Sequence, residues 1–142
     1  RGSVGIVHGD VPTGMSWQAF KAAVERGDEK VVQTALWGRS RIRGGDSTGV
    51  PGVGRVFVGH TPQWNGLRSY GNVYAIDTGA VFGMTGNAKP GEGRLTMAQL
   101  IAGTQSLKTA TSLQGSNVLV DVRAASGSVV GPFGTSLVGR SM

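Results

Sequence analysis

Short hydrophobic runs alternate with polar segments along the chain, and two of these runs share one layout. Val4–Val7 is an apolar, β-branched run that predicts a buried strand, and the polar residues 8–12 follow where this strand ends. Arg55–Val58 predicts a second strand, which runs into residues 59–62. Each predicted strand therefore delivers one histidine, His8 or His60, to a loop at its carboxyl end.

Apolar residues at helical spacing mark two segments between these strands. The first has one apolar face made by Trp17, Phe20, Ala23 and Val24. With Ser16 as its N-cap, this spacing predicts a helix over about residues 16–26. Asp28 follows Gly27 and can cap a second helix, predicted over residues 29–36.

Helical spacing becomes scarce after residue 37, where glycine and polar residues dominate. Residues 37–52 are predicted as a loop, and residues 70–76, 94–101 and 117–123 as strands. The first two of these strands are separated by residues 77–82 and a loop that contains residues 86–91. The segment after residue 103 is rich in Gly, Ser and Thr, and we expect its last fifteen or so residues to be mobile. The pattern predicts an α/β (α+β) domain over residues 1–102 and an extension over residues 103–142.

Composition narrows the class of protein without naming it. The chain has 142 residues, 39% of them hydrophobic, which suits one domain with its own core. Its 25 glycines favour turns and short strands, and the absence of cysteine excludes disulfides and Cys-ligated metals. Fourteen Lys and Arg against 8 Asp and Glu give a charge of +6, which attracts anions. Since no apolar run is long enough for a membrane span, we expect a soluble protein. This composition suits a secreted or a cytosolic protein, and our prediction for its location is cytoplasmic.

The two histidines are the first candidates for chemistry. Imidazole is the commonest metal ligand, and carboxylates at Asp10, Asp46 and Asp77 can complete a shell for Mn²⁺, Fe or Zn²⁺. Taken singly, a histidine at a strand end is more often a hydrogen-bonded structural residue. The separation of His8 and His60 matches no metal-binding motif, so spacing alone leaves both interpretations open.

The basic loop is the second candidate. Arg39, Arg41 and Arg43 stand at alternate positions and can grip phosphate through bidentate contacts, or can simply be solvated. Trp37 can stack on a nucleobase, but we predict it to be a core anchor at the end of the second helix.

Four motifs, read in order, add a family resemblance. They are VHGDVP at residues 7–12, LWGRSRI at 36–42, VGHTP at 58–62, and YAIDTGAVF at 74–82 followed by GRLT at 93–96. Together they resemble the second half of the phosphoprotein phosphatases, of the calcineurin-like metallophosphoesterase superfamily. The bacterial and bacteriophage-lambda serine/threonine phosphatases are the most similar members, and the resemblance covers roughly residues 3–101.

The resemblance implies a metal-dependent phosphatase acting on phosphoserine and phosphothreonine. It implies a binuclear centre, of Mn or alternatively Fe or Zn, whose bridging hydroxide attacks phosphorus in line. His8 and His60 would ligate one ion, Arg39 would clamp the substrate phosphate, and Arg41 would lie near it. Asp77 and Thr78 would shape the strand turn beneath the site, and we expect Asp10 to hydrogen-bond a histidine. The superfamily also hydrolyses diadenosine tetraphosphate, and these residues do not separate the two substrates.

The chain departs from the family by lacking the motifs of its first half, GDxHG, GDxxDRG and GNHE. Two metal-ligating histidines remain, so we expect the chain alone not to turn over a substrate. We expect a missing N-terminal half or a partner chain to complete the metal site. The family fold is a β-sandwich with flanking helices, and half of it leaves a sheet edge and an apolar face uncovered. We therefore expect association, for example as a homodimer. The alternative function is an inactive module that binds a phosphorylated or nucleic-acid ligand.

Overall fold

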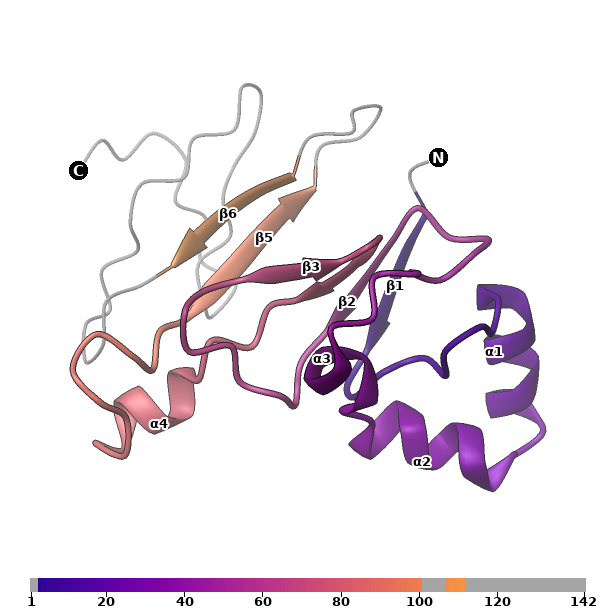
Figure 1. Cartoon of the computed structure of the whole chain (residues 1–142), viewed down its shortest axis with the longest axis horizontal. Helices are drawn as coiled ribbons and strands as arrows, with labels where there is room; N and C mark the ends of the chain where they lie inside the picture. The colour runs from indigo at the N-terminus through magenta and orange to yellow at the C-terminus, as the bar shows by residue number, and fades with distance from the viewer. Residues whose placement is uncertain (1–2, 101–106, 112–142) are drawn as a thin grey trace. The chain divides into compact units, whose positions relative to one another are not determined.

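A computed structural model of the chain describes residues 3–100 and 107–111. Within them the protein is mixed α/β, with small sheets and a few short helices (Figure 1). The chain divides into two compact units, the first up to residue 77 apart from residues 64–66, the second made of residues 64–66 and those from 78 on. The α/β class predicted from the sequence is confirmed at this level.

The first unit is built on a four-stranded sheet with the order β1-β2-β4-β3. Strands β1 (Val4–Val7), β2 (Arg55–Val58) and β4 (Val73–Ala75) are parallel, and β3 (Arg68–Tyr70) is antiparallel to β4. Because the three parallel strands are in register at their last residues, their carboxyl ends meet at one edge of the sheet. Residues 8, 59–60 and 76–77 follow these ends.

Two helices pack on one face of this sheet. Helix α1 (Trp17–Glu25) begins at Ser16, whose hydroxyl accepts from the Ala19 amide, and α2 (Glu29–Trp37) begins at Asp28, whose carboxylate accepts from the Val31 amide. Both predicted helices and both predicted caps are confirmed. The shared core is formed by Val7, Val11, Phe20, Ala23, Val31, Val50, Val56, Val58, Tyr70, Val73 and Ala75.

Other segments of the first unit differ from the sequence prediction. Helix α3 (Ser40–Gly44) occupies part of the predicted loop over residues 37–52. The predicted strand over residues 70–76 is a hairpin of β3 and β4, which turns at Gly71 with φ 64°. The Asn72 side chain fixes this turn, since its amide donates to the carbonyls of Val50 and Val53 and its oxygen accepts from the Val50 amide.

The opposite face of the sheet is only partly covered. Phe57 is buried and stacks on Tyr74, with ring centroids 5.5 Å apart, whereas the neighbouring Ile6 on the edge strand β1 is 82% exposed. An exposed aliphatic side chain on an edge strand is the kind of feature that natural sheets normally protect.

The second unit contains helix α4 (Ala80–Met84) and an antiparallel pair, β5 (Thr96–Leu100) and β6 (Leu107–Thr111). Helix α4 lies where the sequence predicts no helix, and β5 is shorter than the predicted strand over residues 94–101. The predicted boundary at residue 102, the predicted strand over 117–123 and the predicted mobile end lie outside the described residues. Among the described residues, no helix has the length and apolar character needed to cross a membrane.

Candidate functional site at the carboxyl edge of the sheet

The two histidines of the chain meet at the carboxyl edge of the first unit's sheet. His8 follows β1 and His60 follows β2, and the Nε2 atom of His8 lies 3.1 Å from the Nδ1 atom of His60. The ring centroids are 4.8 Å apart. Two residues 52 positions apart in the sequence therefore form one imidazole pair, because parallel pairing in register brings the two strand ends together.

The backbone at His60 is shaped to deliver this ring. Among the non-glycine residues that the structure describes, His60 alone has a positive φ, which is 62°. The Gly59 amide donates to the His8 carbonyl oxygen at 3.0 Å, and the Thr61 amide donates back to the Gly59 carbonyl oxygen at 2.6 Å. A left-handed conformation costs an L residue about 1 to 2 kcal/mol, and such strain concentrates where a side chain has a function.

The end of α2 is held against the loop that carries His8. The Gly9 amide donates to the Ala35 carbonyl oxygen at 2.6 Å, and the Asp10 amide donates to the Thr34 carbonyl oxygen at 3.1 Å. A Cβ atom on Gly9 would lie 2.7 Å from the Thr34 oxygen, so only glycine allows this approach. The contact places the residues that follow α2 beside the histidine pair.

Arg39 and Trp37 are the residues that this contact brings to the pair. The Trp37 ring meets the His60 ring edge-on, with centroids 5.4 Å apart, and the Nη1 atom of Arg39 donates to the Thr61 hydroxyl at 3.4 Å. Trp37 is 63% exposed. The prediction that it anchors the core is wrong, since the ring lies against the candidate site instead.

The imidazole of His60 is surrounded mainly by groups that favour its neutral form. Partial burial lowers the pKa of His60 from its usual 6.5, and the neighbouring Arg39 and His8 lower it further, while Asp77 acts in the opposite direction. A neutral imidazole has a lone pair free to accept a hydrogen bond or bind a metal. One ring can therefore donate its N–H to the unprotonated nitrogen of the other.

This shift makes the stability of the fold depend on pH. Because the pKa of His60 is lower in the folded than in the unfolded chain, its contribution is present above pH 6.5 and is lost as the pH falls through the folded pKa. We expect the midpoint of thermal unfolding to fall between pH 7 and pH 5, and the slope over this range to be shallower in His60→Asn. The measurement is thermal unfolding by circular dichroism at half-unit pH steps. Equal slopes for the two proteins would contradict the assignment.

Arg41 is placed differently from the role expected by resemblance. Its side chain has no exposed surface, its Nε atom donates to Asp10 Oδ1 at 2.9 Å and its Nη2 atom donates to the Val11 carbonyl oxygen at 3.0 Å. Asp46 lies 3.7 Å from its Nη1 atom. A guanidinium whose donors are engaged inside the protein holds the loops together and has no surface with which to meet a substrate.

Of the three carboxylates considered as metal ligands, two are held by other partners and one lies at the same sheet edge as the histidines. Asp10 binds Arg41 and the Val11 amide where a hydrogen bond to a histidine was expected, so that expectation is wrong. Asp46 accepts from Thr13 and Thr48, which holds the pKa of its carboxyl at about 2. Asp77 follows β4 at the same sheet edge and acts electrostatically on His60.

Thr78, predicted to shape the turn beneath the site, is buried in the second unit. Its hydroxyl donates to the Arg94 carbonyl oxygen at 2.6 Å and lies 2.7 Å from the Thr96 hydroxyl. The residue ties the start of this unit to the chain that enters β5.

The histidine pair has the spacing that a metal ion needs. Two nitrogens about 2.1 Å from one ion, at an angle of about 90 to 110°, lie about 3.0 to 3.4 Å apart, and the observed separation of 3.1 Å falls in this range. No group of three or more His, Asp or Glu side chains in the described part of the chain could hold an ion. The residues fit two ligands of one ion and leave the rest of its shell to be supplied.

In comparisons with known proteins, no family model, no curated protein and no solved structure matches the chain. The site thus rests on its own geometry. Sequence reasoning missed Thr61 as the partner of Arg39, although its position directly after His60 was a signal that could have found it.

Proposed function

We propose that the intact protein hydrolyses phosphomonoesters with the help of a divalent metal, as a cytoplasmic serine/threonine phosphatase of the calcineurin-like superfamily. This chain would contribute two metal ligands, His8 and His60, and a phosphate-binding residue, Arg39. The observation that carries the proposal is the 3.1 Å approach of the two ring nitrogens at a sheet edge that also presents Arg39. A binuclear manganese centre is the cofactor that the family resemblance favours.

The chain's own residues would each do one part of the work. To hold an ion, the Nε2 atom of His8 and the Nδ1 atom of His60 would both have to be unprotonated, so the proton of their hydrogen bond would move to solvent or to the other nitrogen of its ring. The ion, once bound, would neutralise charge on phosphoryl oxygens and lower the pKa of water. Arg39 is half-buried, and its only hydrogen bond within the described residues is the long one to Thr61, so most of its guanidinium donors can meet phosphate oxygens.

The rest of the ion's shell would come from a missing N-terminal half or from a partner chain. The uncovered side chain of Ile6 on the edge strand β1 supports this arrangement, since another strand or a second copy of the chain would cover it. The homodimer expected from the sequence would use the same face.

A second function is favoured by the absence of any three-residue metal group among the described residues. In this alternative the chain binds a phosphorylated protein or nucleic acid through Arg39 and its basic neighbours and catalyses nothing. Both functions need Arg39, but only the phosphatase needs a metal and His60.

The test follows from this difference. We expect Mn²⁺ to tighten the binding of inorganic phosphate at least tenfold in isothermal titration calorimetry, and His60→Asn to remove the effect of Mn²⁺. Asparagine is chosen because it tolerates the left-handed backbone at position 60. We expect Arg39→Ala to weaken phosphate binding about 10- to 100-fold with or without metal, because it removes a charge-assisted contact.

Arg68→Ala is the matched control, because Arg68 is an exposed arginine on β3, outside the basic loop. Hydrolysis of p-nitrophenyl phosphate is followed in the same samples, and Mn²⁺-dependent turnover lost in His60→Asn would show that the site is complete in the sample. If neither Mn²⁺ nor His60→Asn changes the affinity for phosphate, the phosphatase proposal is overturned and the binding module remains.

A further inference from the structure

A second candidate site lies wholly within the second unit. It is a cavity of about 290 Å³, lined by Trp64, Asn65, Gly66, Thr78, Gly91 and Arg94. Its volume lies just below the usual range for small-molecule pockets, about 300 to 1,000 Å³, so only a small ligand fits. None of its residues belongs to the histidine site described above.

The indole of Trp64 is a fixed platform on one side of this cavity. Its ring packs on Gly79, where a Cβ atom would overlap the ring, and it meets Phe82 edge-on with centroids 5.4 Å apart. Two neighbours thus set its orientation, yet the residue keeps 40% of its surface exposed. A held and exposed indole offers a face on which a planar ring can stack at little entropic cost.

Arg94 provides the positive charge on the other side. Its Nε atom donates to the Gly91 carbonyl oxygen at 2.9 Å, which fixes the base of the guanidinium. Within the described part of the chain, its two terminal nitrogens have no hydrogen bond or ion pair. They present the paired donors that match the oxygens of a phosphate.

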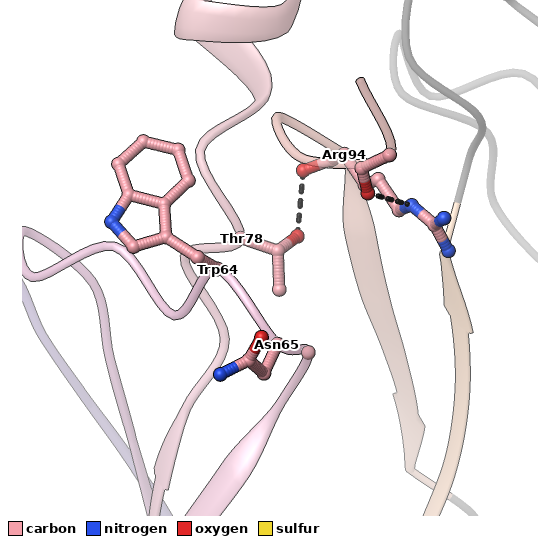
Figure 2. Close-up of a pocket in the computed structure, with 6 residues that line it drawn as sticks. Trp64, Asn65, Thr78 and Arg94 are labelled. Atoms are coloured by element: carbon pink, nitrogen blue, oxygen red, sulfur yellow. Dashed lines mark hydrogen bonds between the residues drawn. The ribbon is translucent and has the colours of Figure 1, made fainter. Parts of the chain in front are cut away.

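The arrangement of these groups defines the ligand. Figure 2 shows Trp64 and Arg94 on opposite sides of Thr78, with the guanidinium directed away from the indole and the Asn65 amide below Thr78, on the side of the indole. A ligand that uses both groups needs a planar ring at one end, an anion at the other and a spacer between them. The hydroxyl of Thr78 is already engaged by Arg94 and Thr96, so Asn65 is the neutral polar side chain left to bind the spacer or the ring edge.

From this geometry we infer that the cavity binds a nucleoside monophosphate, with its base stacked on Trp64 and its phosphate on Arg94. A free aromatic ring or free phosphate satisfies only one side of the cavity. A nucleotide satisfies both, its sugar supplies the spacer, and Asn65 lies on the side where the base stacks.

The test uses the side-chain N–H signals of the three tryptophans in a ¹⁵N-labelled sample of the chain. Adding AMP is expected to shift the Trp64 signal with saturation, whereas adenosine or inorganic phosphate at the same concentration shifts it at least tenfold less. The signal is assigned with Trp64→Phe. Arg94→Gln is expected to raise the half-saturating AMP concentration at least tenfold. Asn65→Ala, at an exposed position, is expected to raise it severalfold.

Two controls separate this site from the histidine site. Arg68→Gln removes an exposed arginine outside the cavity and should leave the titration unchanged. Arg39→Ala removes the phosphate-binding residue of the proposed phosphatase, and the Trp64 response should survive it, whereas the Trp37 signal reports ligand near His60. The inference is overturned by an unmoved Trp64 signal at millimolar AMP, by an equal response to adenosine or phosphate, or by an unchanged titration in Arg94→Gln.

Discussion

Replacing Arg41 with methionine is expected to lower the free energy of unfolding by about 3 to 5 kcal/mol, the usual cost of removing one partner of a buried ion pair. The Arg41 side chain has no exposed surface, and that of its partner Asp10 is 6% exposed. Without the guanidinium, Asp10 would be left as a buried charge held by the Val11 amide alone. The loss is a large fraction of the 5 to 15 kcal/mol by which a typical domain is stable.

Chemical denaturation followed by circular dichroism measures this loss. Arg43→Met on the same helix is the matched control, and we expect it to change the free energy of unfolding by less than about 0.5 kcal/mol, because Arg43 is exposed. Arg41→Lys is expected to recover only part of the loss, because one ammonium cannot reach Asp10 and the Val11 carbonyl with the geometry of a guanidinium. A loss below about 1 kcal/mol in Arg41→Met would show that the pair does not organise the loops.

Replacing Gly83 with alanine is expected to destabilise the second unit by about 3 kcal/mol, in the upper part of the range for overpacked positions. Gly83 is buried in α4, and a methyl group there would overlap the Gly93 carbonyl oxygen. The obstacle is backbone, so it cannot move aside as the end of a side chain can. The loop that follows α4 would have to shift to make room.

Hydrogen exchange of the amides in residues 78–96, together with thermal unfolding, detects this change. Gly86→Ala lies in the same loop and serves as the control, because open space surrounds it and its cost comes from a positive φ of 73° alone. That cost is about 1 kcal/mol. Equal effects of the two substitutions would mean that the close approach of Gly83 and Gly93 contributes little to stability.

The elements that the sequence predicted well are those whose signals are local. Ser16 and Asp28 cap helices with hydrogen bonds to amides three residues away, so the residue type and its position suffice to find them. Helices α3 and α4 have five residues each, too short to show a hydrophobic period. Their existence depends on neighbours that are distant in the sequence.

The candidate site shows the same division. The strand-then-histidine layout located both His8 and His60, but their meeting depends on the parallel register of β1 and β2, which no spacing reveals. Arg39 and Arg41 look equivalent in the sequence. Only the fold distinguishes them, since it turns one toward the histidine pair and encloses the other with Asp10.

The left-handed backbone at His60 determines which residues position 60 accepts without strain. Glycine adopts that conformation without strain, so a variant library selected for stability alone would drift toward glycine at position 60. Selection for a function of the imidazole would instead retain histidine at this position. A histidine at a position that glycine would occupy without strain therefore gives up some stability for the presence of its ring.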